Sequence, residues 1–463
     1  MTIWSPVIDE RGPVYLAITR ALEADIRDGR LRPGDRLPPH RDLAAAIGVN
    51  VGTVSRAYAE ARRRRLIRGE VGRGTFVCAP LDAALVPRQG SDSSRQTLDL
   101  SVNIPLADSS ADLREALRAL ADRVDLERIT AYGDPAGAPH VRRAGTRWLE
   151  SLGVPCEPDR VAVTAGAQHG ILVALAAVVG PGERVLAESL TYPGLVASAR
   201  MLGLRVGPVA TDLRGLIPEA VDAACAADRP RLLYCMPALH NPTAAQMDLE
   251  RRQALVDLAR RYDLVIVQDD VLAGLVADPH ASLARLAPER VITITGLSKT
   301  IAPGLRTAFV AAPPPLARRI AELVWSSTWM SSPIGAELAA FLIEHGHADR
   351  TLARRRDEMA ARHTLLGDSL AGLDYVTRPG SYHVWLRLPA PWHGSSFAAA
   401  LDVQGIVVSP AEAFLAAPGP APHAVRISLS GVTDRADLAL ALTRIGAEAR
   451  GAPTAPAVPA VRL

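Results

Sequence analysis

Lysine is almost absent from this sequence. Among the 52 lysine and arginine residues of the 463-residue chain, Lys299 in the stretch TGLSKTIAP is the only lysine, and the rest are arginine. Arginine replaces lysine in surface charge pairs and phosphate contacts, but its guanidinium stays protonated and cannot act as a nucleophilic amine. One retained lysine therefore indicates either a codon bias that missed a single position or a lysine that forms a Schiff base.

Cysteine and long apolar runs are also scarce. The cysteines, Cys78, Cys156, Cys225 and Cys235, show neither metal-site nor disulfide spacing, so we expect reduced side chains, no metal and a cytoplasmic protein. No uncharged apolar run reaches the ~20 residues of a membrane span, and the N-terminal MTIWSPVIDERGP lacks a signal core. With 48% hydrophobic and 22% charged residues, the composition is that of a globular protein with two or three domains.

Charge is distributed unevenly along the chain. The net charge is +3, but residues 1–77 contain 14 arginines against 9 acidic residues, so the excess of positive charge lies at the N-terminal end. A basic segment of this kind indicates contact with a polyanion, although a solvated helix face would give the same count.

Residues 1–78 predict a small domain of helices and one hairpin. Helical patterns cover residues 13–29, 41–48 and 49–66, with Asn50 as the cap of the third. Two short apolar strands surround EVGRG and predict a hairpin. This order is the plan of a winged helix-turn-helix domain, which sets its third helix in the major groove of DNA.

The same segment resembles the GntR family of DNA-binding proteins. The match runs through LRPGDRLPPHRDLAAAIGVNVGTVSRAY and the wing GRGTFV. The resemblance implies that double-stranded operator DNA is contacted by Arg41, Asn50, Gly52, Thr53, Arg56, Arg73 and Thr75.

This chain departs from the family pattern at four places. Val51 stands where arginine is frequent, which puts base readout there in question. Pro39 and His40 replace small hydroxyl residues, and Arg65 replaces a glycine that often ends the helix. The run of arginines at 62–65 fits a DNA-facing or a solvated surface, and we expect about half of it to be solvated.

The body of the chain lies between two segments without periodicity. Residues 79–97 predict a linker, and the Ala/Pro-rich residues 451–463 predict a disordered tail. Within residues 98–450, strand-like apolar runs alternate with helical runs, which predicts an α/β domain with a mostly parallel central sheet. Ligands of such sheets bind at the carboxyl ends of strands, where the sequence has Gln168, Asn241, Asp269 and Lys299.

Seven motifs follow one another in the body: AYGDPAG, TAGAQHG, LTYPG, HNPTA, VQDD, GLSKTIAPGLR and VRISLS. In this order they resemble the fold-type I aminotransferases, the aspartate aminotransferase superfamily, which use pyridoxal 5'-phosphate (PLP). The resemblance extends over about 350 residues. A single motif would be weak evidence for it, but seven motifs in the same order are specific.

The resemblance implies a role for each motif residue. Lys299 would be the catalytic residue that forms the aldimine with PLP. Asp269 would keep the pyridinium nitrogen protonated, Asn241 would donate to the phenolic oxygen, and Tyr192 would stack on the ring. The phosphate site would comprise Gly166, Ala167, Gln168, Ser298 and Arg306, together with Tyr132 from the partner subunit of a homodimer. Arg426 would bind a ligand carboxylate.

Some of these roles have a plain structural alternative. Arg426 also fits an arginine on a surface strand, Tyr192 fits a core residue, and Asp270 competes with Asp269 for the acidic role. For Lys299, the motif and the lack of any other lysine agree.

The motifs also depart from the aminotransferase pattern. Val271 stands where related sequences usually have tyrosine, the second donor to the phenolic oxygen. Gly296 and Ala167 replace hydroxyl residues that are common in the phosphate site. These changes indicate a cofactor site that is not tuned for turnover.

A GntR-type reader, a linker and an aminotransferase-like body together resemble the MocR family of bacterial regulators, which has GabR-like and PdxR-like members. The resemblance implies a PLP-dependent transcriptional regulator that senses an amino acid, an amine or PLP at Lys299 and shifts between two arrangements of a dimer. Two alternatives stay open: an active aminotransferase with an appended DNA-binding domain, and a DNA-binding protein whose vestigial body no longer holds PLP.

Overall fold

The computed structural model describes residues 4, 6, 13–27, 30–31, 35–63, 66–70, 74–77, 97–106, 110–123, 126–276 and 282–451. The predicted linker, 79–97, and tail, 451–463, lie outside these ranges except for one residue each. Arg73 also lies outside the described residues.

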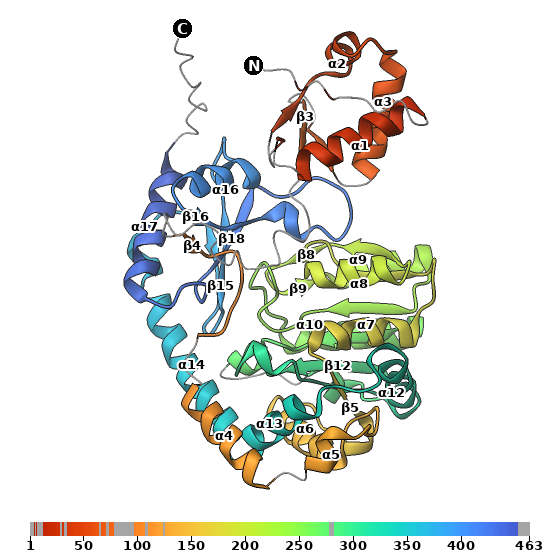
Figure 1. Cartoon of the computed structure of the whole chain (residues 1–463), viewed down its shortest axis with the longest axis vertical. Coiled ribbons are helices and arrows are strands. Elements are labelled where there is room, and N and C mark those ends of the chain that lie inside the picture. Colours follow the sequence, from red (N-terminus) through yellow and green to blue (C-terminus); the bar gives the residue numbers. More distant parts are fainter. Residues whose placement is uncertain are drawn as a thin grey trace.

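The N-terminal domain has the predicted order of helices and wing (Figure 1). In the three-stranded sheet, β3 lies between β1 and β2 and is antiparallel to both. The short strand β1 was not predicted, because it falls in the turn-rich stretch before the second helix and exists only through its pairing with β3. The elements are α1 (Val14–Arg27), β1 (Arg36–Leu37), α2 (His40–Ala46), α3 (Val51–Arg63), β2 (Ile67–Glu70) and β3 (Gly74–Val77).

One aromatic residue of α3 anchors the core of this domain. Tyr58 is buried among apolar side chains that include Ile18 and Leu22 of α1, and its hydroxyl donates to the carbonyl of Pro38 at 2.9 Å. The edge of the His40 ring meets the Tyr58 ring, with centroids 4.9 Å apart. His40 therefore packs α2 against α3, which gives this departure from the family pattern a structural role.

The body is built on a seven-stranded sheet in the order β5-β13-β12-β11-β10-β6-β7. β13 is antiparallel to its neighbours β12 and β5, and the other neighbouring pairs are parallel. The predicted mostly parallel sheet is confirmed. Its strands are β5 (Val161–Thr164), β6 (Arg184–Glu188), β7 (Arg205–Val209), β10 (Leu232–Cys235), β11 (Val265–Asp269), β12 (Val291–Gly296) and β13 (Ala308–Ala311).

Helices cover both faces of this sheet (Figure 1). Leu232 and Tyr234 of β10 contribute to the core on one face, and Leu233 and Cys235 to the core on the other. Burial on both faces explains why the strands are continuous apolar runs. One face is covered by α7 (Ala167–Val178), α8 (Pro193–Met201) and α12 (Pro314–Thr328), and the other by α6 (Pro139–Ser151), α9 (Pro218–Asp228) and α10 (Leu249–Tyr262).

A second, smaller sheet carries Arg426. Its strands are antiparallel in the order β14-β15-β18-β17, and the register sets Arg426 opposite Trp385 and Ser409. A parallel pair, β4 with β16, joins the first strand of the body to its C-terminal part. The bounds are β4 (Leu98–Asp99), β14 (Tyr375–Val376), β15 (His383–Arg387), β16 (Ile406–Val407), β17 (Ser409–Pro410) and β18 (Ala424–Ser428).

The other elements connect and cover these sheets. No helix in the described ranges is long and apolar enough to cross a membrane. The remaining elements are α4 (Ser110–Arg123), α5 (Leu126–Thr130), β8 (Thr211–Asp212), β9 (Gly215–Leu216), α11 (Leu283–Leu286), α13 (Pro333–Glu344), α14 (His347–His363), α15 (Leu366–Ser369), α16 (Gly394–Val403), α17 (Arg435–Arg450) and the short 3-10 helices η1 (Pro158–Arg160), η2 (Ala273–Leu275), η3 (Pro303–Leu305) and η4 (Ala411–Phe414).

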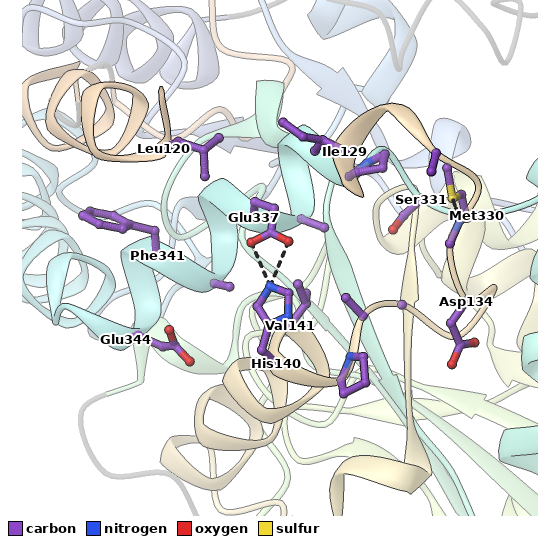
Figure 2. Close-up of a pocket in the computed structure, with 18 of the residues that line it drawn as sticks. Leu120, Ile129, Asp134, His140, Val141, Met330, Ser331, Glu337, Phe341 and Glu344 are labelled. Carbon is purple, nitrogen blue, oxygen red and sulfur yellow. Dashed lines mark hydrogen bonds and ion pairs between the residues drawn. The ribbon is translucent and has the colours of Figure 1, made fainter. Parts of the chain in front are cut away.

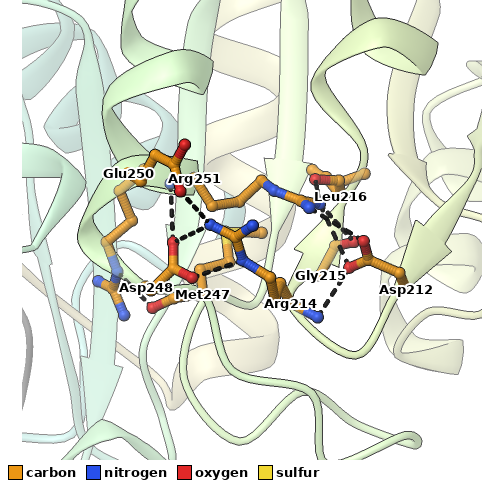
Figure 3. Close-up of polar contacts among 9 residues, drawn as sticks. Asp212, Arg214, Gly215, Leu216, Met247, Asp248, Glu250 and Arg251 are labelled. Atoms are coloured by element: carbon orange, nitrogen blue, oxygen red, sulfur yellow. Dashed lines mark hydrogen bonds and ion pairs between the residues drawn. The ribbon is translucent and has the colours of Figure 1, made fainter.

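Two arginines form hydrogen bonds that connect the start of α10 to the β8–β9 hairpin (Figure 3). Asp248 caps α10 by accepting from the backbone N–H of Arg251 at 2.9 Å, and it also accepts from Nη2 of Arg214 at 2.9 Å. Nη2 of Arg251 donates to Asp212 at 2.9 Å. These contacts fix the beginning of the helix that leads into β11, the strand that ends at Asp269.

Candidate functional site

The candidate site lies where three neighbouring parallel strands end. Asp269 is the last residue of β11, Lys299 follows β12, and Asn241 follows β10. Because parallel strands present their carboxyl ends at one edge of a sheet, residues distant in sequence meet there. Tyr192 and Gly166 follow the ends of β6 and β5 in the same way.

Lys299 is partly buried in this site. Its Nζ donates to the backbone carbonyl of Asn103 at 2.6 Å. Burial, with the positive charges of Arg426 and Arg306, lowers the pKa of Lys299 to about 8, and the negative charge of Asp269 opposes the shift. A larger fraction of this amine is therefore unprotonated and nucleophilic near neutral pH than for an exposed lysine.

Asp269 is buried and accepts two hydrogen bonds. Its Oδ2 accepts from the hydroxyl of Tyr234 at 2.6 Å, and its Oδ1 accepts from the backbone N–H of Val271 at 3.3 Å. Burial raises the pKa of Asp269 to about 6, although both hydrogen bonds and the charge of Lys299 favour the carboxylate.

The neighbouring Asp270 has a different environment. Nε2 of Gln268 donates to its Oδ2, and the charge of Arg252 opposes the burial that raises its pKa. The electrostatic interaction with Lys299 falls on Asp269. The charge interaction with Lys299 therefore favours Asp269 over Asp270 as a candidate acidic group of this site.

Arg426 is buried, not on the surface. Its Nη1 donates to Oδ1 of Asn241 at 2.6 Å, and its Nη2 donates to the carbonyl of Ser101. The guanidinium carbon lies 4.8 Å from the ring centroid of Phe414, a cation–π distance. Its buried Nε has no hydrogen-bond partner among the described residues, so the side chain retains a donor for a ligand oxygen.

Gly166, Arg306 and Ser298 form the part of the site that suits a phosphate. Gly166 is the N-cap of α7 with φ of 88°, and a Cβ there would lie 2.5 Å from Nη2 of Arg306. That Nη2 donates to the carbonyl of Ala165 at 3.3 Å. Oγ of Ser298 is buried without a hydrogen-bond partner within the described residues. A guanidinium, an unpartnered hydroxyl and the open N–H groups of a helix start are phosphate ligands.

Gly296, one of the predicted departures, has a structural cause. A Cβ at this position would lie 3.0 Å from Cβ of Ala308 and 3.3 Å from the carbonyl oxygen of Thr307. Close pairing of β12 with β13 therefore leaves little room for a hydroxyl side chain there. The structure shows no comparable cause for Ala167 or Val271.

Gln168 ties the start of α8 to α7, and Tyr192 stands at the N-cap of α8. Nε2 of Gln168 donates to the carbonyl of Gly194 and to Oγ of Ser198, both at 2.8 Å. Tyr192 is half-buried at the N-cap of α8, and burial raises its pKa to about 12. The Gln168 amide nitrogen is thus engaged, and the backbone N–H of Gln168 in the first turn of α7 is the group that suits a phosphate.

Tyr132 is 79% exposed, and its ring contacts Trp329 with centroids 4.8 Å apart. It lies at a cavity of about 570 Å³ between α4, α6 and α13. Figure 2 shows Nε2 of His140 facing the carboxylate of Glu337 in this cavity, 2.8 Å from both oxygens. Lys299 is not among the residues that line this cavity.

The described residues among those predicted to face DNA lie on α2, at the start of and along α3, and on β3 of the wing. Arg41, Gly52 and Arg56 are exposed, as is Val51. Oδ1 of Asn50 accepts from the backbone N–H of Gly52 at 2.7 Å, which confirms Asn50 as the N-cap of α3. The predicted Thr53 and Thr75 are partly exposed.

Sequence reasoning missed several residues around Lys299. The hydroxyl of Tyr382 donates to the Lys299 carbonyl at 2.7 Å. Nδ1 of His383 lies 3.0 Å from Nδ2 of Asn103, and its Nε2 lies 3.0 Å from the carbonyl of His240. Burial and the charge of Arg426 lower the pKa of His383 to about 3, so its ring is neutral. No local motif marks these residues, and their contacts depend on the packing of the two sheets.

Comparison with protein families matches both parts of the chain. Residues 95–445 match the family "Aminotransferase class I and II", and residues 14–77 match "Bacterial regulatory proteins, gntR family". In the described ranges, no group of three or more His, Cys, Asp or Glu side chains is placed to hold a metal ion.

Relatives match the chain over nearly its full length. The HTH-type transcriptional regulator YdeF of Bacillus subtilis (strain 168), itself uncharacterized, is 30% identical over 92% of each chain. The vitamin B6 salvage pathway transcriptional repressor PtsJ of Salmonella typhimurium (strain LT2) is 30% identical over 88% of this chain and 92% of its own. In fold, the body resembles the crystal structure of an archaeal alanine:glyoxylate aminotransferase, with a TM-score of 0.71 and 20% identity over 77% of this chain and 91% of that one.

The fold and these matches define a transcriptional regulator with an aminotransferase-type body. The chain belongs to the aminotransferase class I and II family and, as a whole, to the MocR-type HTH transcriptional regulators, in which a GntR domain is fused to that body.

Proposed function

We propose that the protein binds PLP covalently at Lys299 and uses the loaded site to sense an amino acid, an amine or PLP itself, thereby changing its affinity for operator DNA. The observation that carries this proposal is Lys299. The only lysine of the chain stands in the site where burial lowers its pKa to about 8, between Asp269 and the cations Arg306 and Arg426.

The residues around Lys299 fit PLP by the chemistry of their donors and acceptors. Asp269 would face the pyridine nitrogen, and Asn241 the phenolic oxygen. Tyr192 would stack on the ring. The phosphate would be held by Gly166, Ala167, Gln168, Ser298 and Arg306. When bound, PLP supplies an electrophilic carbonyl carbon and an electron-accepting ring.

Arg426 would orient an incoming ligand. Its buried guanidinium already carries hydrogen bonds to an amide oxygen and a backbone carbonyl, and its Nε remains without a partner in the described part of the chain. A carboxylate is the ligand group that matches this fork. The proposed effector class is therefore an amine that also carries a carboxylate, which describes an amino acid.

The DNA-binding part would read operator DNA through α3 and the wing. We propose phosphate or base contacts from Arg41, Asn50, Gly52, Thr53, Arg56, Arg73 and Thr75. We also propose a homodimer in which Tyr132 reaches the phosphate site of the partner subunit. The exposure of Tyr132, Trp329 and Trp325 supports this arrangement, since large exposed aromatic groups are a mark of interfaces.

The direct test of the cofactor site is the visible absorption spectrum of the purified protein and of Lys299→Ala, each with added PLP. The proposal expects a band in the wild type that changes with added amines and is missing from the variant. No band in either protein would overturn it and would leave the body as a scaffold for a DNA reader.

A second candidate function is transamination. The joint presence of Lys299, Asp269, Asn241 and Arg426 in one site favours it, because these groups bind the cofactor and substrate of an aminotransferase. Steady formation of a keto acid from an amino acid by the PLP-loaded protein would support this function. The lack of a tyrosine at Val271 predicts slow turnover.

A further inference from the structure

Tyr234 lies behind the candidate cofactor site and belongs to none of its motifs. It stands in β10, next to β11, and its hydroxyl donates to Oδ2 of Asp269 at 2.6 Å. Both side chains are buried, at 0% and 2% exposure. Water therefore does not replace this hydrogen bond when it is removed, which makes its loss costly.

The surroundings of Asp269 leave Tyr234 as a central support of its carboxylate. Oδ1 receives only the long contact from the backbone N–H of Val271, at 3.3 Å, within the described residues. The other titratable groups that interact with Asp269 are Lys299, Asp270, Glu188, Tyr192 and Cys235. Lys299 is the basic group among them, and in the proposed function its amine would be bonded covalently to PLP.

We propose that Tyr234 is a positioning residue of the cofactor site: its phenol fixes the orientation of the Asp269 carboxylate and keeps that carboxylate ionised toward the pyridine nitrogen. This inference rests on the proposed PLP function. The hydrogen bond lowers the pKa of Asp269, whereas burial raises it. Removing the hydrogen bond should therefore raise the pKa of Asp269. Each carboxylate oxygen accepts two hydrogen bonds, so the bond from Tyr234 leaves capacity for the cofactor.

The experiment compares PLP binding to wild type, Tyr234→Phe and Tyr262→Phe. Tyr262, the last residue of α10, is the control, because its hydroxyl also donates to a carboxylate, that of Asp222 on α9, at 2.7 Å. We expect about tenfold weaker PLP binding for Tyr234→Phe, since a hydrogen bond to a charged group is lost, and a shifted pH midpoint of the cofactor's absorption band. Tyr262→Phe should match the wild type in both.

A cycle with Asp269→Asn shows whether Tyr234 acts through Asp269. If it does, Tyr234→Phe changes the Asp269→Asn protein much less than it changes the wild type. Equal effects in both backgrounds, or an unchanged band midpoint in Tyr234→Phe, would overturn the proposal. Wild-type protein that binds no PLP would instead overturn the function on which it rests, so the two failures are distinguishable.

Tyr234→Phe removes a buried polar atom and must fold to be informative. If it does not fold, the same titration on protein with 3-fluorotyrosine at position 234 gives the answer. The more acidic phenol donates a stronger hydrogen bond, so the band midpoint should differ from that of the wild type. An unchanged midpoint would contradict the proposal.

Discussion

Arg426 and Asn241 are joined by a 2.6 Å hydrogen bond from Nη1 to Oδ1, although Arg426 lies on β18 of the smaller sheet and Asn241 lies in the loop that follows β10 of the larger one. The same arginine is held by Ser101, from the first segment of the body. Three distant parts of the chain therefore meet at one buried cation, beside the single lysine. The hydrogen bond therefore links Arg426, which is proposed to bind the effector carboxylate, to Asn241, which is proposed to contact the phenolic oxygen of PLP.

Arg426 should determine affinity for the carboxylate of the effector. In PLP-loaded protein, Arg426→Lys should weaken amino acid binding by about tenfold or more, because the planar fork is lost while the charge remains. Binding of the amine that lacks the carboxylate should change little. Spectral titration with an amino acid and with its decarboxylated amine measures both. Equal weakening of the two ligands would contradict the assignment of Arg426.

The lowered pKa of Lys299 predicts the pH dependence of PLP attachment. The unprotonated amine is the nucleophile, so the rate should rise with pH and level off above about 8, where burial and neighbouring cations set the pKa. The appearance of the absorption band after mixing apoprotein with PLP gives this rate. A midpoint near 10.5, the ordinary lysine value, would show that Lys299 is not held in this environment.

Glu188 should make the protein less stable as pH rises. Burial raises its pKa from 4.5 to about 8, so between these values the folded state keeps a proton that the unfolded state has released, and stability falls. Glu188→Gln removes this loss. Thermal melts should show similar stability of the two proteins near pH 5. At pH 8.5 the free energy of unfolding of the variant should be higher by a few kcal/mol, because one pKa unit corresponds to about 1.4 kcal/mol. A variant that is equally destabilised at both pH values would contradict this prediction.

Arg56, an exposed arginine on α3, should contribute to DNA affinity through phosphate or base contact. Arg56→Ala should weaken operator binding and reduce its dependence on salt, since fewer counterions are released. Arg114→Ala, an exposed arginine on α4 of the body, is the control and should bind as the wild type does. Fluorescence anisotropy at several salt concentrations provides both quantities. Loss of affinity in both variants would indicate a general charge effect.

The exposed aromatic pair should stabilise the proposed dimer. Removing the Tyr132–Trp329 contact in Trp329→Ala should raise the dimer dissociation constant by about tenfold or more, as expected for an interface aromatic. Met201→Ala changes another exposed apolar side chain, 77% exposed on α8, and should leave the constant unchanged. Sedimentation velocity over a range of concentrations measures the constant, and a monomeric wild type would contradict the dimer.

The sequence predicted the parts of this architecture that depend on local pattern. Strand runs buried on both faces and motif residues at their ends led to the sheet and to the edge where Asp269 and Lys299 meet. Tyr234 escaped prediction because it stands in an apolar strand and looks like core. Its partnership with Asp269 exists only through the adjacency of β10 and β11.

Contacts between remote segments were likewise beyond local reasoning. Asn103 reaches Lys299 because the start of the body pairs with β16 near its end. His40 was noted as a departure from a family pattern, and its edge-on contact with the Tyr58 ring exists only because α2 packs against α3. Such contacts depend on the tertiary arrangement, which composition and periodicity do not encode.

The central claim is that ligand chemistry at Lys299 controls DNA binding. Its most direct test is the dissociation constant for operator DNA of PLP-treated wild type and Lys299→Ala, each measured with and without the effector amine identified by spectral titration. The account predicts that the amine changes the dissociation constant of the wild type at least fivefold and does not change that of the variant. A fivefold change corresponds to about 1 kcal/mol, the lower range of typical allosteric coupling. An equal response of both proteins, or no response of the wild type, would contradict it.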